Sequence, residues 1–224
     1  MDVTHYDIRL KVDPYKKTIG GTVNITFVLI SKADMIEIDL LDQFNVSGTS
    51  INGMNLSFDH KGHKIIIHNP DLDIFKTHIL EIKYSGQPPI AKRPPWDGGF
   101  VWGKDEMGRD YVSVSCEGDG CSLWWPMKDH ISDEPDNGAR MTFTVPQNLV
   151  CVSNGKLLET KQDVFSGKQS YTWEVTSPIN NYSISVQLGN YVGGIRKDYL
   201  DLKDEELRLQ TATGRGFYLT ATNA

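Results

Sequence analysis

The sequence predicts an all-β protein, an antiparallel multi-sheet sandwich or saddle, from two observations. Short segments in which apolar and polar residues alternate follow one another between residues 6 and 192, with turn residues between them. Only residues 201–210 combine regularly spaced leucines with charges in the manner of a helix. Alternation with period two is typical of strands that bury one face, and many short strands at regular spacing favour stacked sheets.

The elements follow in a regular order. The first strand, YDIRLKVD, alternates strictly, and the second is rich in β-branched residues after Gly20-Gly21. The sequence NLSFDHKGHKIIIHN predicts a hairpin because the polar DHKGHK segment separates two strands. The single strands are predicted at 6–13, 18–30, 34–41, 77–86, 139–146, 149–160, 169–177 and 182–192.

We expect one domain over residues 1–192, followed by a tail. Within the domain, four prolines in GQPPIAKRPPW at 86–96 cannot donate ladder hydrogen bonds, so this segment is predicted to be a surface connection. Residues 193–224 have no clear pattern apart from the helical stretch at 201–210, so they form a tail of unassigned origin.

Net charge argues against a nucleic-acid partner, and hydropathy argues against a membrane-spanning segment. The net charge of -6 argues against a nucleic-acid partner, which requires a basic face. No apolar run reaches the roughly 18 residues that span a bilayer, so no membrane span is expected. The sequence does not distinguish the cytoplasm from export after removal of a signal peptide.

The histidines and acids do not predict a metal site. His60 and His63 lie at a hairpin tip without further ligands nearby, and structural zinc needs four. We therefore expect solvated turn histidines. The acidic loop after residue 128 lacks the ligand spacing of a calcium loop, and we expect it to be solvated. Its acids are Asp129, Asp133, Glu134 and Asp136.

The densest stretch of the chain is SVSCEGDGCSLWWPMKD, residues 113–129. Cys116 and Cys121 could form a disulfide if the loop folds back, but two separate buried thiols are the favoured interpretation. Glu117 follows a strand and precedes a glycine-rich turn, so it could bind a cationic ligand. Composition and spacing alone favour an exposed rim carboxylate. No catalytic motif, including His-Glu-x-x-His, occurs in the sequence.

Several segments together resemble the N-terminal domain of the aminopeptidase N family of zinc metallopeptidases. They are VTHYDIRLKVDPYKKTIGGTVNITF, SCEGDG, WWPMKDHISDEPDNGARMTFTVP, VSNG and SPINNYSISVQLGNY, which together extend over residues 3–192. The resemblance implies the all-β fold of these domains. Trp124, Trp125 and Pro126 are expected in the core because large aromatic side chains bury most of their area. The resemblance also implies a non-catalytic domain that caps the active site of an aminopeptidase, whose catalytic domain is its partner.

By position, the resemblance makes Glu117 the residue that binds the free α-amino group of a peptide substrate, with Ser115 and Gly118 beside it. Ser115 replaces the glutamine of many members, which leaves the amine with fewer polar partners. Zinc would belong to the catalytic domain of a full-length parent. This chain lacks the zinc motif, so we expect no cofactor in it and no hydrolysis by it alone.

The alternative hypothesis is a stand-alone β-sandwich module that binds carbohydrate or protein. Its candidate surface is formed by Trp96, Phe100 and Trp102, whose rings could stack on a ligand.

Overall fold

The computed structural model of the chain describes residues 1–68, 70–94, 98–116 and 119–191. Within these ranges the regular structure consists of strands and two short 3-10 turns, which confirms the all-β prediction. The predicted tail, with its helix at 201–210, lies outside the described residues. No helix in the described part has the length and apolar composition that crossing a membrane requires.

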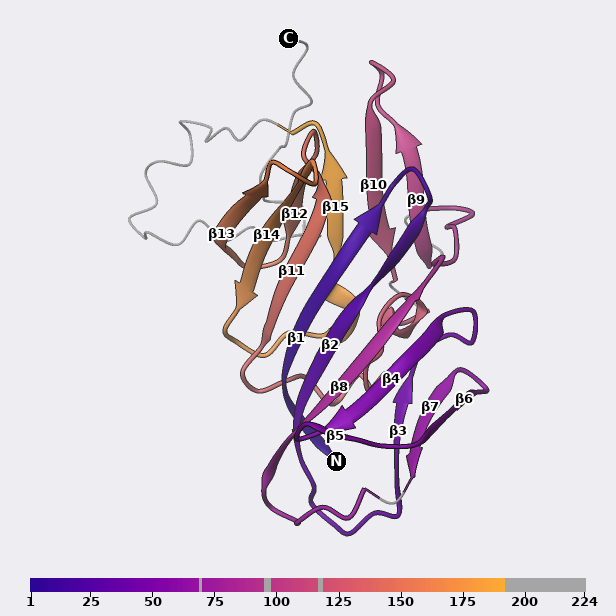
Figure 1. The fold of residues 1–224 in the computed structure, drawn as a ribbon, viewed down its shortest axis with the longest axis vertical. Helices are drawn as coiled ribbons and strands as arrows, with labels where there is room; N and C mark the ends of the chain where they lie inside the picture. Colours follow the sequence, from indigo (N-terminus) through magenta and orange to yellow (C-terminus); the bar gives the residue numbers. More distant parts are fainter. Residues whose placement is uncertain (69, 95–97, 117–118, 192–224) are drawn as a thin grey trace.

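The largest sheet has eight strands and runs through the length of the molecule (Figure 1). Its centre is formed by β1 (Asp2–Asp13), which lies between β2 (Thr18–Val28) and β11 (Ala139–Pro146). On one side follow β14 (Lys168–Val175) and β13 (Lys156–Asp163), and on the other β8 (Thr77–Gly86), β4 (Asn45–Ile51) and β5 (Met54–Asn55). The β1–β11 pair is parallel, whereas the other pairs of this sheet are antiparallel.

Two smaller sheets lie toward opposite ends of the large one (Figure 1). The four-stranded sheet has the order β12 (Val150–Ser153), β15 (Val186–Gly189), β10 (Asp110–Ser115), β9 (Gly99–Lys104). The three-stranded sheet has the order β3 (Met35–Asp39), β7 (Lys64–His68), β6 (Phe58–Lys61), and its β6–β7 hairpin confirms the predicted one. One hydrophobic cluster contains buried residues from all three sheets.

The predicted single strand at 149–160 is wrong, because the chain changes sheets at Asn154. Strand β12 belongs to the four-stranded sheet and β13 to the eight-stranded one. Between them Gly155 has φ +82°, and a Cβ there would lie 2.1 Å from the carbonyl oxygen of Glu174. The Asn154 side chain donates to the carbonyl of Ser183 at 2.9 Å. The Asn-Gly pair therefore marks a corner that the alternating pattern alone does not reveal.

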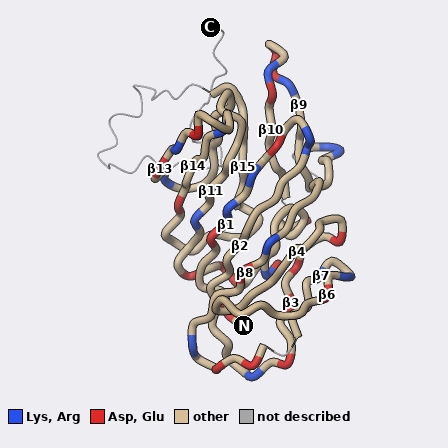
Figure 2. The backbone as a smooth tube through the Cα atoms, in the orientation of Figure 1, with Lys and Arg blue, Asp and Glu red and all other residues tan. Residues whose placement is uncertain are grey.

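Positions occupied by positively and negatively charged residues are interspersed along the described strands and loops (Figure 2).

Candidate functional site

The candidate site follows β10, which is one of the two inner strands of the four-stranded sheet. Ser115 is the last residue of β10, is half-buried and pairs with Gly99 of β9. Glu117 and Gly118 lie outside the described residues. The structure therefore constrains the candidate site through the residues on either side of these two.

We use the name η1 turn for Cys116 and residues 119–122. These residues include the start of the 3-10 helix η1 (Cys121–Leu123). The N–H of Gly120 donates to the carbonyl of Cys116 at 2.9 Å. Cys116 and Cys121 form a disulfide, with their Cα atoms 5.3 Å apart. The structure thus pairs the thiols that the sequence favoured as separate. The η1 turn is closed by a hydrogen bond and a covalent bond.

Asp119 attaches the η1 turn to the end of the proline-rich connection. Its Oδ2 accepts from the N–H of Gly98 at 2.5 Å. The approach is close: a Cβ on Gly98 would lie 2.4 Å from Cδ2 of Leu123. The strand β9 and the η1 turn are therefore held against each other at this point.

The Trp-Trp-Pro segment packs in the core behind the η1 turn, as predicted from the size of its aromatic side chains. Trp124 and Trp125 are fully buried. The Tyr84 hydroxyl on β8 donates to the carbonyl of Trp124 at 2.8 Å, and burial raises the pKa of this hydroxyl well above its usual value. The ring of Trp125 meets that of Tyr6 edge-on, with centroids 4.9 Å apart. These contacts attach the segment to the large sheet.

The same segment also pairs with the three-stranded sheet. Asp39 and Met127 exchange two backbone hydrogen bonds of 2.8 and 3.1 Å. The N–H of Leu41 donates to the carbonyl of Ser122 at 3.3 Å. Residues 119–129 therefore contact all three sheets, since the ring of Trp124 also meets Phe100 of β9 edge-on.

The acidic loop after residue 128 is only partly solvated. Glu134 and Asp136 are exposed, as predicted. Asp133 is instead buried, forms an ion pair with Lys128 and accepts from the N–H of Val3 at 3.4 Å. The prediction of a solvated loop is therefore wrong for Asp133, which ties the loop to the start of β1.

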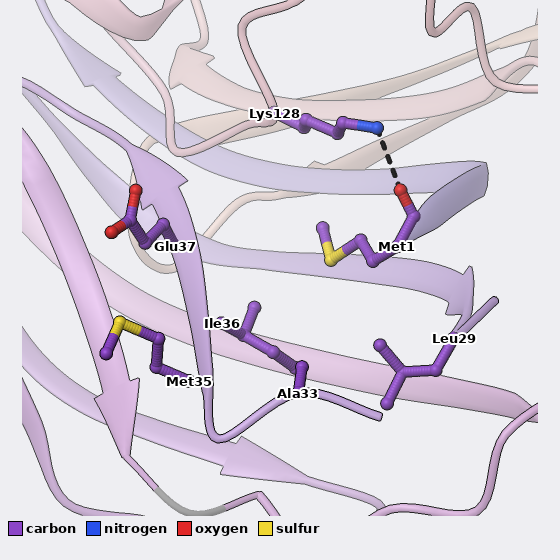
Figure 3. A pocket seen from close by; sticks show the side chains of 7 residues that line it. All are labelled: Met1, Leu29, Ala33, Met35, Ile36, Glu37 and Lys128. Atoms are coloured by element: carbon purple, nitrogen blue, oxygen red, sulfur yellow. Dashed lines mark hydrogen bonds between the residues drawn. The ribbon is translucent and has the colours of Figure 1, made fainter. Parts of the chain in front are cut away.

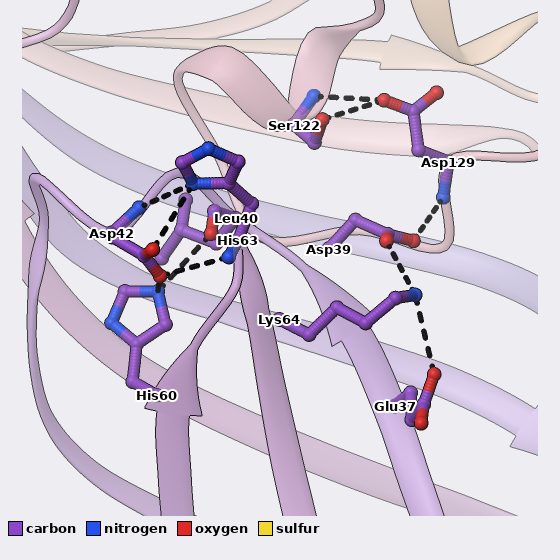
Figure 4. A network of polar contacts seen from close by, with 9 residues as sticks. All are labelled: Glu37, Asp39, Leu40, Asp42, His60, His63, Lys64, Ser122 and Asp129. Atoms are coloured by element: carbon purple, nitrogen blue, oxygen red, sulfur yellow. Dashed lines mark hydrogen bonds and ion pairs between the residues drawn. The ribbon is translucent and has the colours of Figure 1, made fainter.

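The two hairpin histidines form internal contacts rather than a ligand set (Figure 4). His60 Nε2 donates to the carbonyl of Leu40 at 3.1 Å, and His63 Nδ1 accepts from the N–H of Asp42 at 3.2 Å. His60 is therefore not the solvated residue that was predicted. No group of three or more His, Cys, Asp or Glu side chains within the described ranges could hold a metal ion. These residues do not fit a zinc ion.

A small pocket of about 160 Å³ opens between the N-terminus and β3 (Figure 3). The ammonium of Lys128 points along its wall and donates to the carbonyl of Met1 at 2.8 Å. Ligand pockets usually enclose at least roughly 300 Å³, so this one is too small to be the main site. Its lining consists of Met1, Leu29, Ala33, Met35, Ile36, Glu37 and Lys128.

Of the aromatic surface in the alternative hypothesis, Phe100 is covered by the core, whereas Trp102 is half-buried. Phe100 is fully buried and stacks on Trp102 with ring centroids 5.0 Å apart. Its other neighbour is Trp124, which meets it edge-on. Trp96 lies outside the described residues. The expectation that Phe100 stacks on a ligand is wrong, because its ring is covered by the core.

Comparison with known proteins agrees with this architecture. Residues 3–183 match the family described as the Peptidase M1 N-terminal domain. The chain belongs to this family. The match includes the strands of all three sheets except β15 and the first residue of β1, and it includes the η1 turn.

Solved structures similar to this M1 N-terminal domain include an M1 zinc metallopeptidase and a yeast LTA4 hydrolase. The M1 zinc metallopeptidase from Deinococcus radiodurans has 25% sequence identity and a TM-score of 0.70, over 84% of this chain and 42% of that one. Native yeast LTA4 hydrolase shares the fold, with 20% identity and a TM-score of 0.64, over 87% of this chain and 30% of that one. The chain therefore spans less than half the length of these relatives.

A curated relative matches a shorter part of the chain. The transcription initiation factor TFIID subunit 2 of Drosophila melanogaster is 27% identical over 86 residues, which is 38% of this chain and 7% of that protein.

Sequence reasoning missed the residues that hold the candidate site in place. Asp119 and Asp129 both bind main-chain N–H groups next to the η1 turn. Neither contact had a local signal, since Asp119 binds an N–H group 21 residues away and Asp129 one that is seven residues away. The Tyr84 contact had none either, because its partner Trp124 is 40 residues away in the chain.

Proposed function

We propose that this M1 N-terminal domain covers the active site of a zinc aminopeptidase and that Glu117 binds the free α-amino group of the peptide substrate. The observation that carries the proposal is the construction of the η1 turn. Residues on both sides of 117–118 are fastened by a disulfide and by the Gly120–Cys116 and Gly98–Asp119 hydrogen bonds. A site that must select one substrate group benefits from such rigid support.

The chemistry of the residue suits an ammonium group. A peptide N-terminus presents three N–H donors and one positive charge, and a carboxylate accepts hydrogen bonds while it balances the charge. Holding the amine at a set distance from the scissile bond restricts cleavage to the first residue. Ser115, at the end of β10, and Gly118 would form the edges of this subsite.

The remaining machinery would come from a catalytic domain of the same polypeptide. No group of three or more His, Cys, Asp or Glu side chains among the described residues could hold a metal ion, and we propose that zinc in the whole protein is held by the catalytic domain. Zinc bound there would polarise the scissile carbonyl and activate water. We propose that residues 1–192 form one folding unit that docks on this catalytic domain.

The first test is to sequence the transcript downstream of the codon for Val192. An in-frame His-Glu-x-x-His motif with a later glutamate supports the proposal. A stop codon soon after residue 224 without that motif contradicts it.

The second test is Glu117→Gln in the full-length protein. Loss of a charge-assisted hydrogen bond worth about 1.5–3 kcal/mol raises KM for unblocked peptides roughly 10- to 100-fold, with a smaller change in kcat. The matched control is Glu106→Gln, at an exposed position in the β9–β10 turn, which leaves KM unchanged. A wild-type KM for Glu117→Gln would show that the residue does not bind the amine.

A further inference from the structure

Three Asn-Gly pairs occur in the sequence, at residues 52–53, 137–138 and 154–155. In such a pair the backbone nitrogen of the glycine can attack Cγ of the asparagine side chain, because glycine has no Cβ to obstruct the approach. The attack requires an asparagine side chain that is free to turn toward this nitrogen. The three pairs have the same chemistry, so their surroundings decide which of them reacts.

Asn154 is held in the core and is not free to turn. The residue is only 6% exposed. Its Nδ2 donates to the carbonyl of Ser183 at 2.9 Å, and its Oδ1 accepts from the N–H of Ser185 at 2.9 Å. Both ends of this amide are therefore bonded in a buried setting, where breaking a hydrogen bond leaves a polar group unsatisfied. We expect the side-chain amide of Asn154 to be stable.

Asn52 is exposed, but its side chain is also held at both ends. Its Oδ1 accepts from the N–H of Ile79 at 3.0 Å, and its Nδ2 lies 3.0 Å from Nδ1 of His78. His78 is buried, and its Nε2 donates to the carbonyl of Asp73 at 2.8 Å. Since a carbonyl can only accept, the neutral ring carries its proton on Nε2, and its Nδ1 accepts from Asn52. The fold therefore restrains this side chain without burying it.

Asn137 is exposed, and its side chain forms no hydrogen bond or ion pair with any described residue. The attacking nitrogen belongs to Gly138, the last residue of a turn, and its N–H donates to the carbonyl of Pro135 at 2.9 Å. This turn hydrogen bond restrains the nitrogen alone, and short loops open at a low cost in free energy. Of the three pairs, 137–138 is the one in which the asparagine side chain is free to turn.

We propose that Asn137 is a site of spontaneous deamidation, whose product loosens the attachment of β11 to β1. The nitrogen of Gly138 forms a bond to Cγ of Asn137 and releases its proton to solvent. The Cγ–Nδ2 bond breaks, and ammonia leaves with a proton taken from solvent. Water then opens the resulting cyclic imide at either carbonyl, which leaves aspartate or isoaspartate at position 137. The inference is independent of the proposed role of Glu117.

The peptide group between Asn137 and Gly138 lies between two backbone hydrogen bonds to β1. The N–H of Asn137 donates to the carbonyl of Thr4 at 2.8 Å, and the carbonyl of Gly138 accepts from the N–H of Tyr6 at 3.3 Å. Isoaspartate adds a methylene group to the main chain between these two bonds. Gly138 cannot move freely to compensate, because a Cβ there would lie 2.0 Å from the carbonyl oxygen of Val175. Isoaspartate therefore disturbs the start of the parallel β1–β11 pair (Figure 1).

The first test compares the three pairs within one sample of the chain. The folded protein is incubated in mildly alkaline buffer, and the peptides that contain each pair are followed by mass spectrometry. We expect deamidation at Asn137 about tenfold faster than at Asn52 or Asn154, because each of those side chains must first break two hydrogen bonds. Comparable rates in the folded protein, or a faster reaction at Asn52, would overturn the proposal.

The matched control is the same incubation in urea, which removes the fold and keeps the sequence. The three rates should then converge, because the hydrogen bonds that hold Asn52 and Asn154 are lost. A tenfold preference for Asn137 that persists in urea would overturn the structural explanation, since it would come from the neighbouring residues in the chain.

The second test measures the consequence for β1 and β11. Asn137→Gln keeps an exposed amide, but glutamine cyclises far more slowly because the ring that it would form is larger. The incubated wild type should unfold at a lower urea concentration than the fresh protein and exchange the Tyr6 amide hydrogen faster, whereas incubated Asn137→Gln should match its fresh sample. An equal loss in Asn137→Gln, or isoaspartate at position 137 without any loss in the wild type, would overturn the proposed loosening.

Discussion

Strands β1 and β13 belong to the same eight-stranded sheet and yet have opposite environments. In β1 alternate residues are fully buried, among them Tyr6 and Ile8. In β13 all eight residues are exposed, including Leu157 and Leu158. β1 is bonded on both sides, whereas β13 is the edge strand and lies at the outer left of Figure 1. Position in the sheet, and not the presence of leucine, decides what is buried.

The edge strand has features that discourage pairing with another chain. A register shift interrupts its ladder between Leu157 and Glu159. Lys156 and Lys161 place charges along the strand. Bulges and lysines are common on edge strands that remain unpaired.

The largest expected effect tests burial directly. Ile8→Ala in β1 should lower the free energy of unfolding by about 2–5 kcal/mol, because it leaves a cavity between the sheets. The matched change Leu158→Ala in β13 should cost less than about 0.5 kcal/mol. Urea denaturation of both variants measures the difference. Equal losses would mean that the edge strand is buried in solution.

A smaller effect tests the polar contacts of the central strand. The Tyr6 hydroxyl accepts from the N–H of Lys128 at 3.2 Å. Tyr6→Phe leaves that N–H unsatisfied and should cost about 1–2 kcal/mol. The control is Tyr15→Phe, in the exposed β1–β2 turn, which should be neutral. The same denaturation assay applies, and a neutral Tyr6→Phe would show that water replaces the hydroxyl.

The smallest effect is a pH dependence of β1. Burial lowers the pKa of His5 below its usual value, an effect that Asp7 opposes. The unfolded chain therefore binds more protons than the native one just below about pH 6.5, so stability falls as the pH drops through this window. His5→Gln should flatten the dependence between about pH 7 and 5. A steeper dependence in the variant would contradict the sign.

Much of the fold could be predicted because a strand with one buried face has an alternating pattern of apolar and polar residues. The strands at 6–13, 77–86 and 139–146 correspond to β1, β8 and β11. The parallel pairing of β1 with β11 has no local sequence pattern, since it joins Tyr6 to Ala139 across most of the chain. Similarly, one strand was predicted over 149–160, although the chain leaves one sheet for another at Asn154–Gly155.

The candidate site was predicted less completely than the fold. The family resemblance pointed to the segment of Glu117, and membership of the M1 N-terminal family is confirmed. The role of Glu117 stays a prediction. What the sequence missed are the contacts of Asp119, Asp129 and Tyr84, because each joins the segment to a partner from another element or loop.

By itself the sequence determined the all-β class, most strand positions and the family, since these depend on local alternation and on motifs read in order. Only the tertiary structure decided that Phe100 is covered, that Asp133 is buried and that residues 119–129 contact three sheets. The physical reason is that burial and hydrogen bonding depend on which distant segments approach one another. A strand's own residues specify its faces but not its neighbours.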